Sequence, residues 1–451
     1  MRMKGVISVM VSALLFAQGC VDKTHLDEFR IPDGNSSKTV SPGKRTGNAE
    51  KRRVFLLYAA GFNTLSSYLR DDIADLEEGF IPGEGRDENV LLVFSKVVPR
   101  FSSYATEISP TLVRYYRDGA GGIVKDTLLV MPVGTNMAKA ETVSQVLTFI
   151  RDNVPARSWG MVLSSHATGW LPEDYYNDPS KYEREHPLAG APSGTRKSMS
   201  ARAPLPGKIP NEPWMPAVKS VTQEVTYISK TEQASSEIEL NDFVAAIPMK
   251  LDYIMFDACL MGGIEVAYAL KEKCSHIAFS QTEVLAQGYE YKQIAGQLLG
   301  GEEADCEAVC RTFFDYYMAQ SGQYKSATIS LVRTDRLDAV AQACRPLFDK
   351  YRSELASMSG DGVQGYFRHE RHYFYDLYDV VAKAGATPQE LDGLKSAIGS
   401  SVEYMGATEE FLGIEINTFS GYSMYLPSMG TAVLDNFYKS LAWNEAAGLV
   451  M

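Results

Sequence analysis

A cysteine and a histidine, each placed at the end of an apolar run, are the residues of this chain best suited to chemistry. Cys259 comes shortly after LDYIMF, residues 251–256, and His166 ends GMVLSSH, residues 160–166. Both runs are short and apolar, so each is predicted to be a buried strand. A thiol is mostly protonated at neutral pH, and a nearby imidazole can take its proton or stabilise the thiolate, as nucleophilic catalysis requires.

Each residue also has a structural alternative. A free cysteine is among the most buried residue types, and a lone histidine at a strand end can be a satisfied core residue. Chemistry is favoured by position, because right-handed crossovers bring the carboxyl ends of parallel strands to one edge of the sheet, where ligands bind. The apolar spacing over residues 260–270 predicts a helix that would place Cys259 at its positive N-terminus.

Strands alternate with helices along most of the chain, which predicts a largely parallel sheet covered by helices on both faces. Apolar helical faces are expected within residues 65–76, 143–150 and 238–247. A hairpin is expected over residues 111–131. The remaining expected strands are residues 54–59, 90–94, 160–166, 251–256, 276–280, 327–332, 413–417 and 422–427.

The alternation stops at Trp170, where a proline-rich insert begins. Residues 171–220 hold nine of the chain's 20 prolines, and the insert as a whole spans residues 171–235. Such a segment is not expected to pack as a regular element, and a long loop inside a domain is usually functional or disordered. Trp170 and Tyr175 either cover the rim of the site or are packing residues. The insert is also basic, with Lys181, Arg184, Arg196, Lys197, Arg202, Lys208 and Lys219.

Composition excludes several classes of function. The chain has 451 residues, a formal net charge of −12, 45% hydrophobic and 22% charged residues, which is typical of a globular protein without a basic field for nucleic acid. Five cysteines follow Cys20, an odd number that leaves at least one free thiol, and no CxxC pair predicts a zinc site. The HERH run at residues 369–372 lacks the spacing of a zinc protease motif, so no metal is expected.

The N-terminus has the features of a targeting segment. A basic start at residues 1–4 and an apolar stretch at 6–17 lead to AQGC, which ends at Cys20. This resembles a bacterial lipoprotein signal, so residues 1–20 are expected to be a signal with Cys20 as the lipidated residue, with an ordinary cleaved signal as the alternative. Residues 21–53 read as a flexible tether and 54–451 as the folded domain. The expected location is a bacterial membrane surface, in the periplasm or on the outer membrane, held by a lipid anchor.

Several segments together resemble the clostripain-like cysteine peptidases, which share the caspase–gingipain fold. The resemblance covers about residues 54–451, and its motifs are ETVSQVLTFIRDN, MVLSSHATGW, IMFDACLMGGIEVAYAL, YDLYDV and SGYSMYLP. It implies a caspase-like three-layer sandwich and a cysteine endopeptidase that cuts after Arg or Lys. In the family, the His and Cys of these motifs form the catalytic dyad, which carries over to His166 and Cys259. The Asp two residues before the Cys selects a basic P1 residue, and that role carries to Asp257.

The sequence departs from the family at three places. Ala167 stands where Gly usually supplies a backbone N–H to the oxyanion hole beside that of Cys259; Ala can serve if its φ is negative. The first strand ends in AGFNTL, residues 60–65, without the usual acid. The insert is longer than a usual processing loop. The first two departures are the only support for an alternative function, an inactive surface-binding lipoprotein that keeps the peptidase fold.

A basic insert beside an active site that prefers basic residues predicts self-cleavage between residues 181 and 219, leaving a heavy and a light chain that stay together. Arg196 and Arg202 are the favoured sites, and Lys197, Lys181 and Arg184 are further candidates. Glu290 is a second candidate for contact with the substrate. The expected partners are polypeptides with Arg or Lys at P1. No cofactor is required for the chemistry, and calcium dependence, known in the family, has no supporting motif here.

Overall fold

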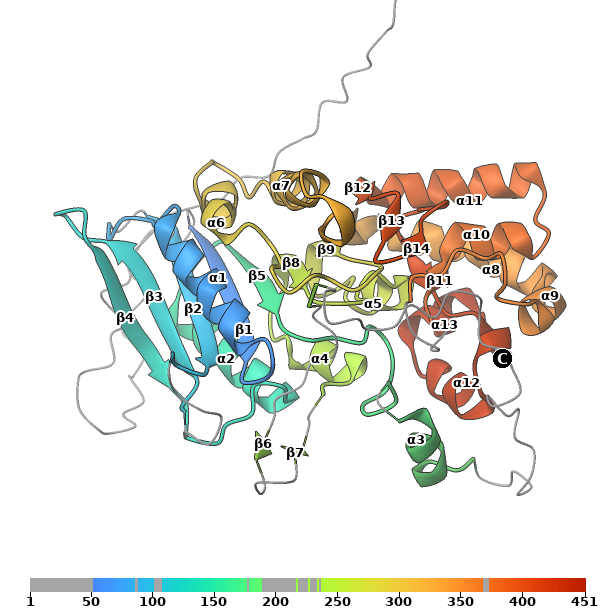
Figure 1. Ribbon diagram of the computed structural model, residues 1–451, viewed down its shortest axis with the longest axis horizontal. Coiled ribbons are helices and arrows are strands. Elements are labelled where there is room, and N and C mark those ends of the chain that lie inside the picture. The colour runs from blue at the N-terminus through green and yellow to red at the C-terminus, as the bar shows by residue number, and fades with distance from the viewer. Residues whose placement is uncertain are drawn as a thin grey trace, which may run out of the picture.

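The computed structural model describes residues 52–85, 88–100, 108–176, 178–188, 216–217, 226–227, 233–234, 237–367 and 373–451. Within these ranges the main sheet consists of β1 (Arg53–Gly61), β2 (Val90–Val97), β3 (Thr111–Arg117), β4 (Ile123–Val130), β5 (Ser158–Ser164), β8 (Leu251–Asp257), β9 (Cys274–Phe279), β10 (Thr328–Arg333) and β12 (Val402–Ala407). Their order is β12-β10-β9-β8-β5-β1-β2-β3-β4 (Figure 1). The five central strands, β2, β1, β5, β8 and β9, are parallel, and the strands on both sides of them are antiparallel.

Burial along the strands explains this arrangement. All nine residues of β1 are buried, as expected for a strand that has a neighbour on each side and helices on each face. β4 forms one edge of the sheet and is mostly exposed, with polar and apolar residues mixed along it. The predicted strands over 54–59, 90–94, 160–166, 251–256, 276–280 and 327–332 and the predicted hairpin are confirmed, with small shifts at their ends.

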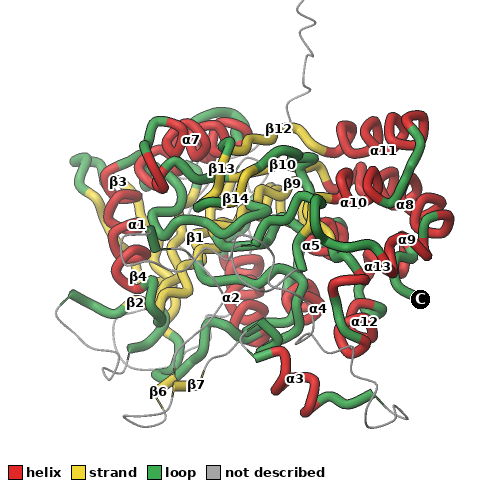
Figure 2. Tube along the Cα trace, turned by 45° about the vertical axis from the view of Figure 1, so that its right-hand side comes forward, coloured by secondary structure: helices red, strands yellow, loops and turns green. Residues whose placement is uncertain are grey.

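Helices cover both faces of the sheet (Figures 1 and 2). On one face, α1 (Ser66–Glu78) packs against α6 (Tyr291–Leu299), and α6 against α7 (Cys306–Met318). On the other face, α2 (Ala140–Asn153) packs against α4 (Leu240–Ala246), and α4 against α5 (Ile264–Ala269). The apolar face predicted for residues 143–150 is the buried face of α2.

The C-terminal helices lie at the end of the molecule away from the β3–β4 hairpin (Figure 1). α8 packs on α11 and α13, and α13 packs on α5. These elements are α8 (Leu337–Lys350), α9 (Arg352–Ser357), α10 (Leu377–Lys383), α11 (Pro388–Ser401), α12 (Ala432–Tyr438) and α13 (Ala442–Ala447), with 3-10 turns at Gly322–Tyr324, Thr334–Arg336 and Pro427–Met429.

Three short two-stranded sheets complete the fold. They pair β6 (Thr226–Tyr227) with β7 (Gln233–Ala234), β11 (Tyr375–Asp376) with β15 (Ser423–Met424), and β13 (Glu410–Phe411) with β14 (Ile414–Glu415). The predicted strands 413–417 and 422–427 are therefore wrong as sheet strands, because only two residues of each pair with another strand. The ninth strand of the main sheet, β12, was not predicted; its residues are mostly only half-buried, so it lacks a buried apolar run.

Two further predictions are corrected. The helix after Asp257 begins at Ile264, five residues beyond Cys259, so the thiol is not at a helix N-terminus. The insert is not free of regular structure, because α3 (Pro179–Glu185) forms within it. Asp178 caps α3 by accepting from the Lys181 N–H, and Pro179 fits the first helical position, where no N–H is needed.

Candidate active site

The His166 and Cys259 segments leave the sheet side by side. β5 and β8 are parallel neighbours, and Ser164 at the end of β5 pairs with Asp257 at the end of β8. His166 and Cys259 each come two residues later, so both begin their turns at the same level of the sheet. The predicted meeting of these two residue positions at one edge is confirmed.

The two turns touch through Gly169 and Leu260. Gly169 has φ of +66°, and a Cβ added there would lie 2.5 Å from the Leu260 carbonyl oxygen. Any side chain at Gly169 would therefore clash with backbone, and its left-handed φ favours glycine independently. Leu260 itself has φ of +60°, a strained conformation for a branched residue directly after Cys259.

The Cys259 thiol is fully buried. The Val284 N–H donates to Sγ at 3.1 Å, and Sγ lies 3.7 Å from the Val284 carbonyl oxygen. Val284 belongs to the loop between β9 and α6, whose next residues are also buried. In that loop the Ala286 N–H donates to the carbonyl oxygen of Ala217 at 2.7 Å. A residue of the insert is thus bonded to the loop that covers the thiol.

His166 is nearly buried and contacts Thr64. Its Nε2 lies 2.9 Å from the Thr64 hydroxyl, on the turn after β1. Next to it, the Ser165 hydroxyl donates to the Ala60 carbonyl at 2.9 Å, which ties the end of β5 to the end of β1. Sequence reasoning missed Thr64, because 102 residues separate it from His166 and a hydroxyl in a turn carries no distinctive pattern.

Asp257 is a buried carboxylate at the end of β8, two residues before Cys259. Its Oδ2 accepts from the Ser164 hydroxyl at 2.9 Å and from the Tyr291 hydroxyl at 2.6 Å. Burial raises the pKa of Tyr291 well above its ordinary value, and the negative charges of Asp257 and Asp72 add to this effect. Asp72 on α1 is a buried acid that sequence analysis did not single out.

Glu290 precedes Tyr291 and sits at the start of α6, half-buried. Burial, followed by the negative charge of Asp75, raises its pKa above the ordinary value. The end of β8, the start of α6 and the facing side of α1 therefore form an acidic region.

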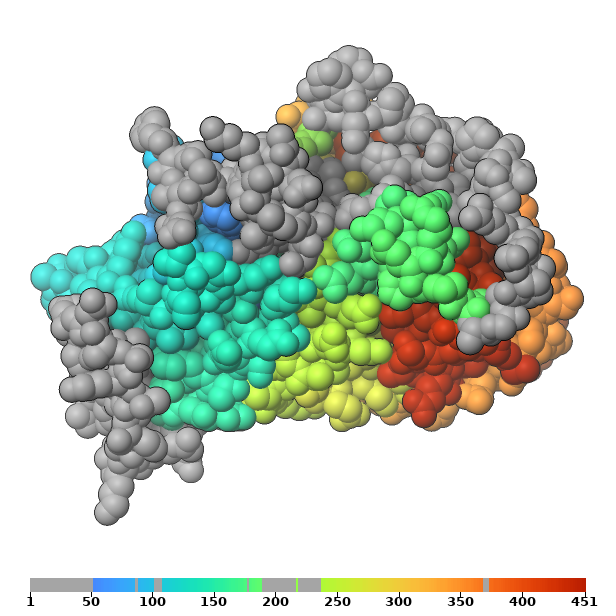
Figure 3. Space-filling model, turned by 90° about the horizontal axis from the view of Figure 1, so that it is seen from below, coloured from blue at the N-terminus to red at the C-terminus, as the bar shows by residue number. Residues whose placement is uncertain are grey.

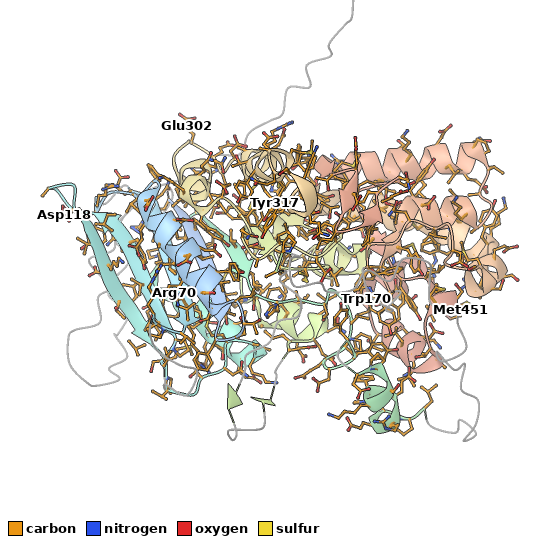
Figure 4. All side chains as sticks on the ribbon, viewed as in Figure 1. Arg70, Asp118, Trp170, Glu302, Tyr317 and Met451 are labelled. Atoms are coloured by element: carbon orange, nitrogen blue, oxygen red, sulfur yellow. The ribbon has the colours of Figure 1, made fainter. Side chains whose placement is uncertain are left out.

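Ala167 does not have a positive φ, so the condition for its N–H to serve in an oxyanion hole is met. Trp170 and Tyr175 are both fully buried, which favours the packing interpretation. The Trp170 ring, labelled in Figure 4, lies 5.0 Å from the rings of both Tyr425 and Tyr438.

Other predicted features lie away from this site or outside the described residues. Cys274, Cys306, Cys310 and Cys344 are buried free thiols whose pKa is raised by burial. Lys181 and Arg184 lie in α3, which covers part of the C-terminal region in Figure 3. Cys20, Arg196, Lys197, Arg202 and residues 369–372 lie outside the described residues.

The described part of the chain has no group of three or more His, Cys, Asp or Glu residues arranged to hold a metal ion. In the same part, no helix is both long enough and apolar enough to span a bilayer.

Comparison with known proteins places these features in a family. Residues 57–182 and 213–442 match the clostripain family, and the unmatched residues between them lie in the insert. A solved inactive zymogen of a C11 protease from Parabacteroides distasonis is 27% identical, with a TM-score of 0.65, and the match covers 88% of this chain and 97% of that one. The comparison with curated proteins gives no match.

Two structures from Bacteroides thetaiotaomicron share the fold. A secreted C11 cysteine protease in complex with an irreversible peptide inhibitor is 20% identical, with a TM-score of 0.65 and coverage of 88% of this chain and 98% of that one. A second structure described as a secreted C11 cysteine protease, iotapain, is 22% identical, with the same TM-score and coverage of 88% and 99%. The fold is the predicted caspase-like three-layer sandwich, and the chain belongs to the clostripain family of cysteine peptidases.

Proposed function

We propose that this protein is an endopeptidase that cuts after Arg or Lys, with Cys259 as nucleophile and His166 as the proton-transfer group. The observation that carries the proposal is the paired register of β5 and β8, which starts both turns at one level, together with the direct Gly169–Leu260 contact. The resemblance of both motifs to the family's dyad assigns the roles.

The chemistry follows from a thiolate and an imidazolium. Cys259 Sγ forms a bond to the scissile carbonyl carbon, and the C–N bond breaks as His166 gives its proton to the leaving amine. Water, deprotonated by His166, then attacks the thioester, releasing the carboxylic acid and returning the thiol. The backbone N–H groups of Cys259 and Ala167 are the donors for the oxyanion that forms in each step.

Basic specificity is supported by the acidic region beside the dyad. Asp257 would bind a guanidinium or ammonium through charge-assisted hydrogen bonds, and the nearby Asp72 and Glu290 add negative charge. In the uncut chain Asp257 is fully buried and bonded to Tyr291. A P1 side chain reaches it only after the Tyr291 hydroxyl at the start of α6 moves. A scissile carbonyl reaches the thiol only after the β9–α6 loop, whose Val284 contacts Sγ, opens.

Self-cleavage in the insert provides that opening. The insert residue Ala217 bonds to Ala286, two residues from Val284, which contacts the thiol through both its N–H and its carbonyl. A cut upstream of Ala217 frees one end of this segment while the sheet holds both chains together. Of the candidate sites, Lys181 and Arg184 are in a helix, whereas a peptidase needs extended substrate. Arg196, Lys197 and Arg202 are therefore preferred.

Two observations count against the alternative of an inactive lipoprotein. Ala167 has no positive φ. At the end of the first strand, where the family's acid is missing, the structure places Thr64 on His166. Lipidation of Cys20 remains part of the proposal and is tested by the mass of the mature N-terminal peptide. Calcium dependence, which no motif of the sequence supports, is tested by activity after chelation.

One comparison of purified proteins tests the dyad and the processing together. Wild type should hydrolyse Arg and Lys reporter peptides, react with a basic acyloxymethyl ketone and yield a new N-terminus within residues 181–219. Cys259→Ala and His166→Ala should show none of the three while still unfolding cooperatively.

Cys344→Ala is the matched control, because it removes an equally buried thiol from α8, away from the site. Its activity should match that of wild type. Activity retained in Cys259→Ala would end the proposed mechanism, and cleavage of Cys259→Ala at the wild-type position would end self-processing.

A further inference from the structure

The catalytic edge of the sheet has two faces of different character. Successive residues of a strand point to opposite faces, so Ser164 and Asp257 face α6, and Leu163 and Phe256 face α4. The Phe256 ring lies 6.2 Å from that of Phe243 on α4. The face that carries Asp257 is acidic, and the opposite face is apolar.

A cavity of about 50 Å³ lies on the apolar face. One side of it is the turn that follows His166, residues 167–169, and another is Met261 from the Cys259 turn. The remaining wall is mainly apolar and includes Leu240, Phe243 and Phe256. Glu237 is its charged residue, and the Glu237 carboxylate accepts the Asp174 N–H at 3.1 Å.

We propose that this cavity is the S1′ subsite and binds a small apolar side chain directly after the cleaved bond. The inference rests on the proposed function. His166 must reach the leaving amine, so the residue that carries this amine lies beside the turn that begins at His166. Neighbouring side chains of an extended substrate point in opposite directions, so a P1 side chain on the Asp257 face leaves the P1′ side chain on the cavity face.

Size and polarity limit what this cavity accepts. Its volume is several times the roughly 10–15 Å³ that holds one water molecule on the same measure, so the side chain of Ala or Val fits. An Asp at P1′ would lose hydration against the apolar walls and face the negative charge of Glu237. A Lys would lose hydration too, and its one acidic partner in the lining is Glu237, whose carboxylate already accepts the Asp174 N–H.

The same limit selects among the self-cleavage sites. Arg196 is followed by Lys197, and Arg202 is followed by Ala203. A small apolar P1′ residue favours the Arg202–Ala203 bond, so the C-terminal chain, which is the heavier of the two, should begin at Ala203. Lys197, followed by Ser198, ranks second, because Ser is small but polar.

Internally quenched peptides that keep Arg at P1 and vary only P1′ test this subsite. We expect kcat/KM for Ala and Val to exceed that for Lys and Asp by roughly tenfold or more, the scale that a pocket of this kind can discriminate. Equal cleavage of all P1′ residues, a preference for charged ones, or selection at P2 instead would overturn the inference. Failure to cut any Arg peptide would instead refute the proposed function.

Two variants that change the size of the cavity in opposite directions distinguish a loss of P1′ selection from a general loss of activity. Leu240→Phe should narrow the cavity and lower the Val-to-Gly ratio of kcat/KM, whereas Phe243→Leu should widen it and raise the Leu-to-Ala ratio. Asn241→Ala, an exposed position on the same helix, is the control and should leave both ratios at wild-type values. Ratios that stay constant in both cavity variants would count against the S1′ assignment. A C-terminal chain that begins elsewhere than Ala203 or Ser198 would also count against it.

Discussion

The Cys259 turn and the His166 turn leave neighbouring strands but are held in different ways. In the Cys259 turn, the Leu260 N–H donates to the Thr282 carbonyl at 2.9 Å, and the Gly262 N–H donates to the Ser280 carbonyl at 2.7 Å. The Gly262 carbonyl in turn accepts the Ser423 N–H at 2.8 Å. On the other turn, the imidazole of His166 is bonded to the hydroxyl of Thr64, an exposed residue.

This difference separates a preformed element from an adjustable one. Backbone bonds from two other segments hold the Cys259 turn and can maintain the strained left-handed φ of Leu260. The imidazole depends on a side-chain contact near solvent. We therefore expect changes around Cys259 to affect folding and substrate binding together, and changes around His166 to affect the rate with little loss of stability.

The largest effect on kcat/KM in this comparison is expected at Asp257, the acid two residues before Cys259. Asp257→Asn should lower kcat/KM for Arg peptides by roughly a hundredfold, because a charge-assisted hydrogen bond contributes about 1.5–3 kcal/mol. Ser164→Ala removes one hydrogen bond to Asp257 but keeps its charge, so it should retain most of the activity. Equal losses in the two variants would show that Asp257 only supports the fold, and Glu290 or Asp72 would then be the next candidates.

Adjacency in the sheet was the part of the site that sequence could predict. Two buried apolar runs, each followed by a potentially reactive residue, are enough to place His166 beside Cys259, because connections between parallel strands are almost always right-handed. The start of α5 could not be predicted in the same way. Apolar residues continue at helical spacing through the Cys259 turn, which favours an earlier helix start. In the structure, however, Leu260 adopts a left-handed φ. The Gly262 N–H donates to the carbonyl oxygen of Ser280, the residue after β9, and not to a carbonyl four residues earlier as in a helix.

Contacts between distant segments were also beyond sequence reasoning. Thr64 approaches His166, and Val284 approaches Cys259, only because β1, β5, β8 and the β9–α6 loop are assembled. Neither residue type is distinctive, and both lie in irregular backbone. Burial of the thiol depends on the loop around Val284, so it could not be inferred from the cysteine's own surroundings in the sequence.

An intermediate effect on activity is expected at Thr64, whose hydroxyl contacts His166. Thr64→Val keeps the shape but removes the hydroxyl from His166 Nε2, so we expect about a tenfold loss of kcat with an unchanged KM, since orientation of a catalytic group governs the rate. The pKa read from the pH–rate profile should shift as well. Thr64→Ser restores the hydroxyl and should restore both quantities. Equal activity and equal pH profiles for the Val and Ser variants would remove Thr64 from the mechanism.

The smallest effect on activity is expected at Glu265, where the effect on stability should nevertheless be measurable. Glu265 lies on α5, shortly after the Cys259 turn, and joins it to the C-terminal region. Its Oε1 accepts the Tyr425 N–H at 2.9 Å and the Tyr438 hydroxyl at 2.6 Å. Complete burial raises the pKa of this carboxyl from 4.5 to about 7. The folded state therefore holds a proton that the unfolded chain has released between these two pH values.

The sign of the pH dependence follows from this. Because the native state binds the extra proton, the contribution of Glu265 to stability is complete below about pH 4.5 and is lost as pH rises through about 7. The whole change amounts to roughly 3 kcal/mol. Glu265→Gln stays neutral and can keep both acceptor contacts, so its free energy of unfolding should fall less than that of wild type between pH 5 and 8. Other carboxylates with raised pKa, such as Asp376, are present in both proteins and cancel in the difference. If the free energy of unfolding depends on pH in the same way for both proteins between pH 5 and 8, Glu265 is already ionised in the folded chain. The segment that follows Cys259 would then be held by its backbone hydrogen bonds alone.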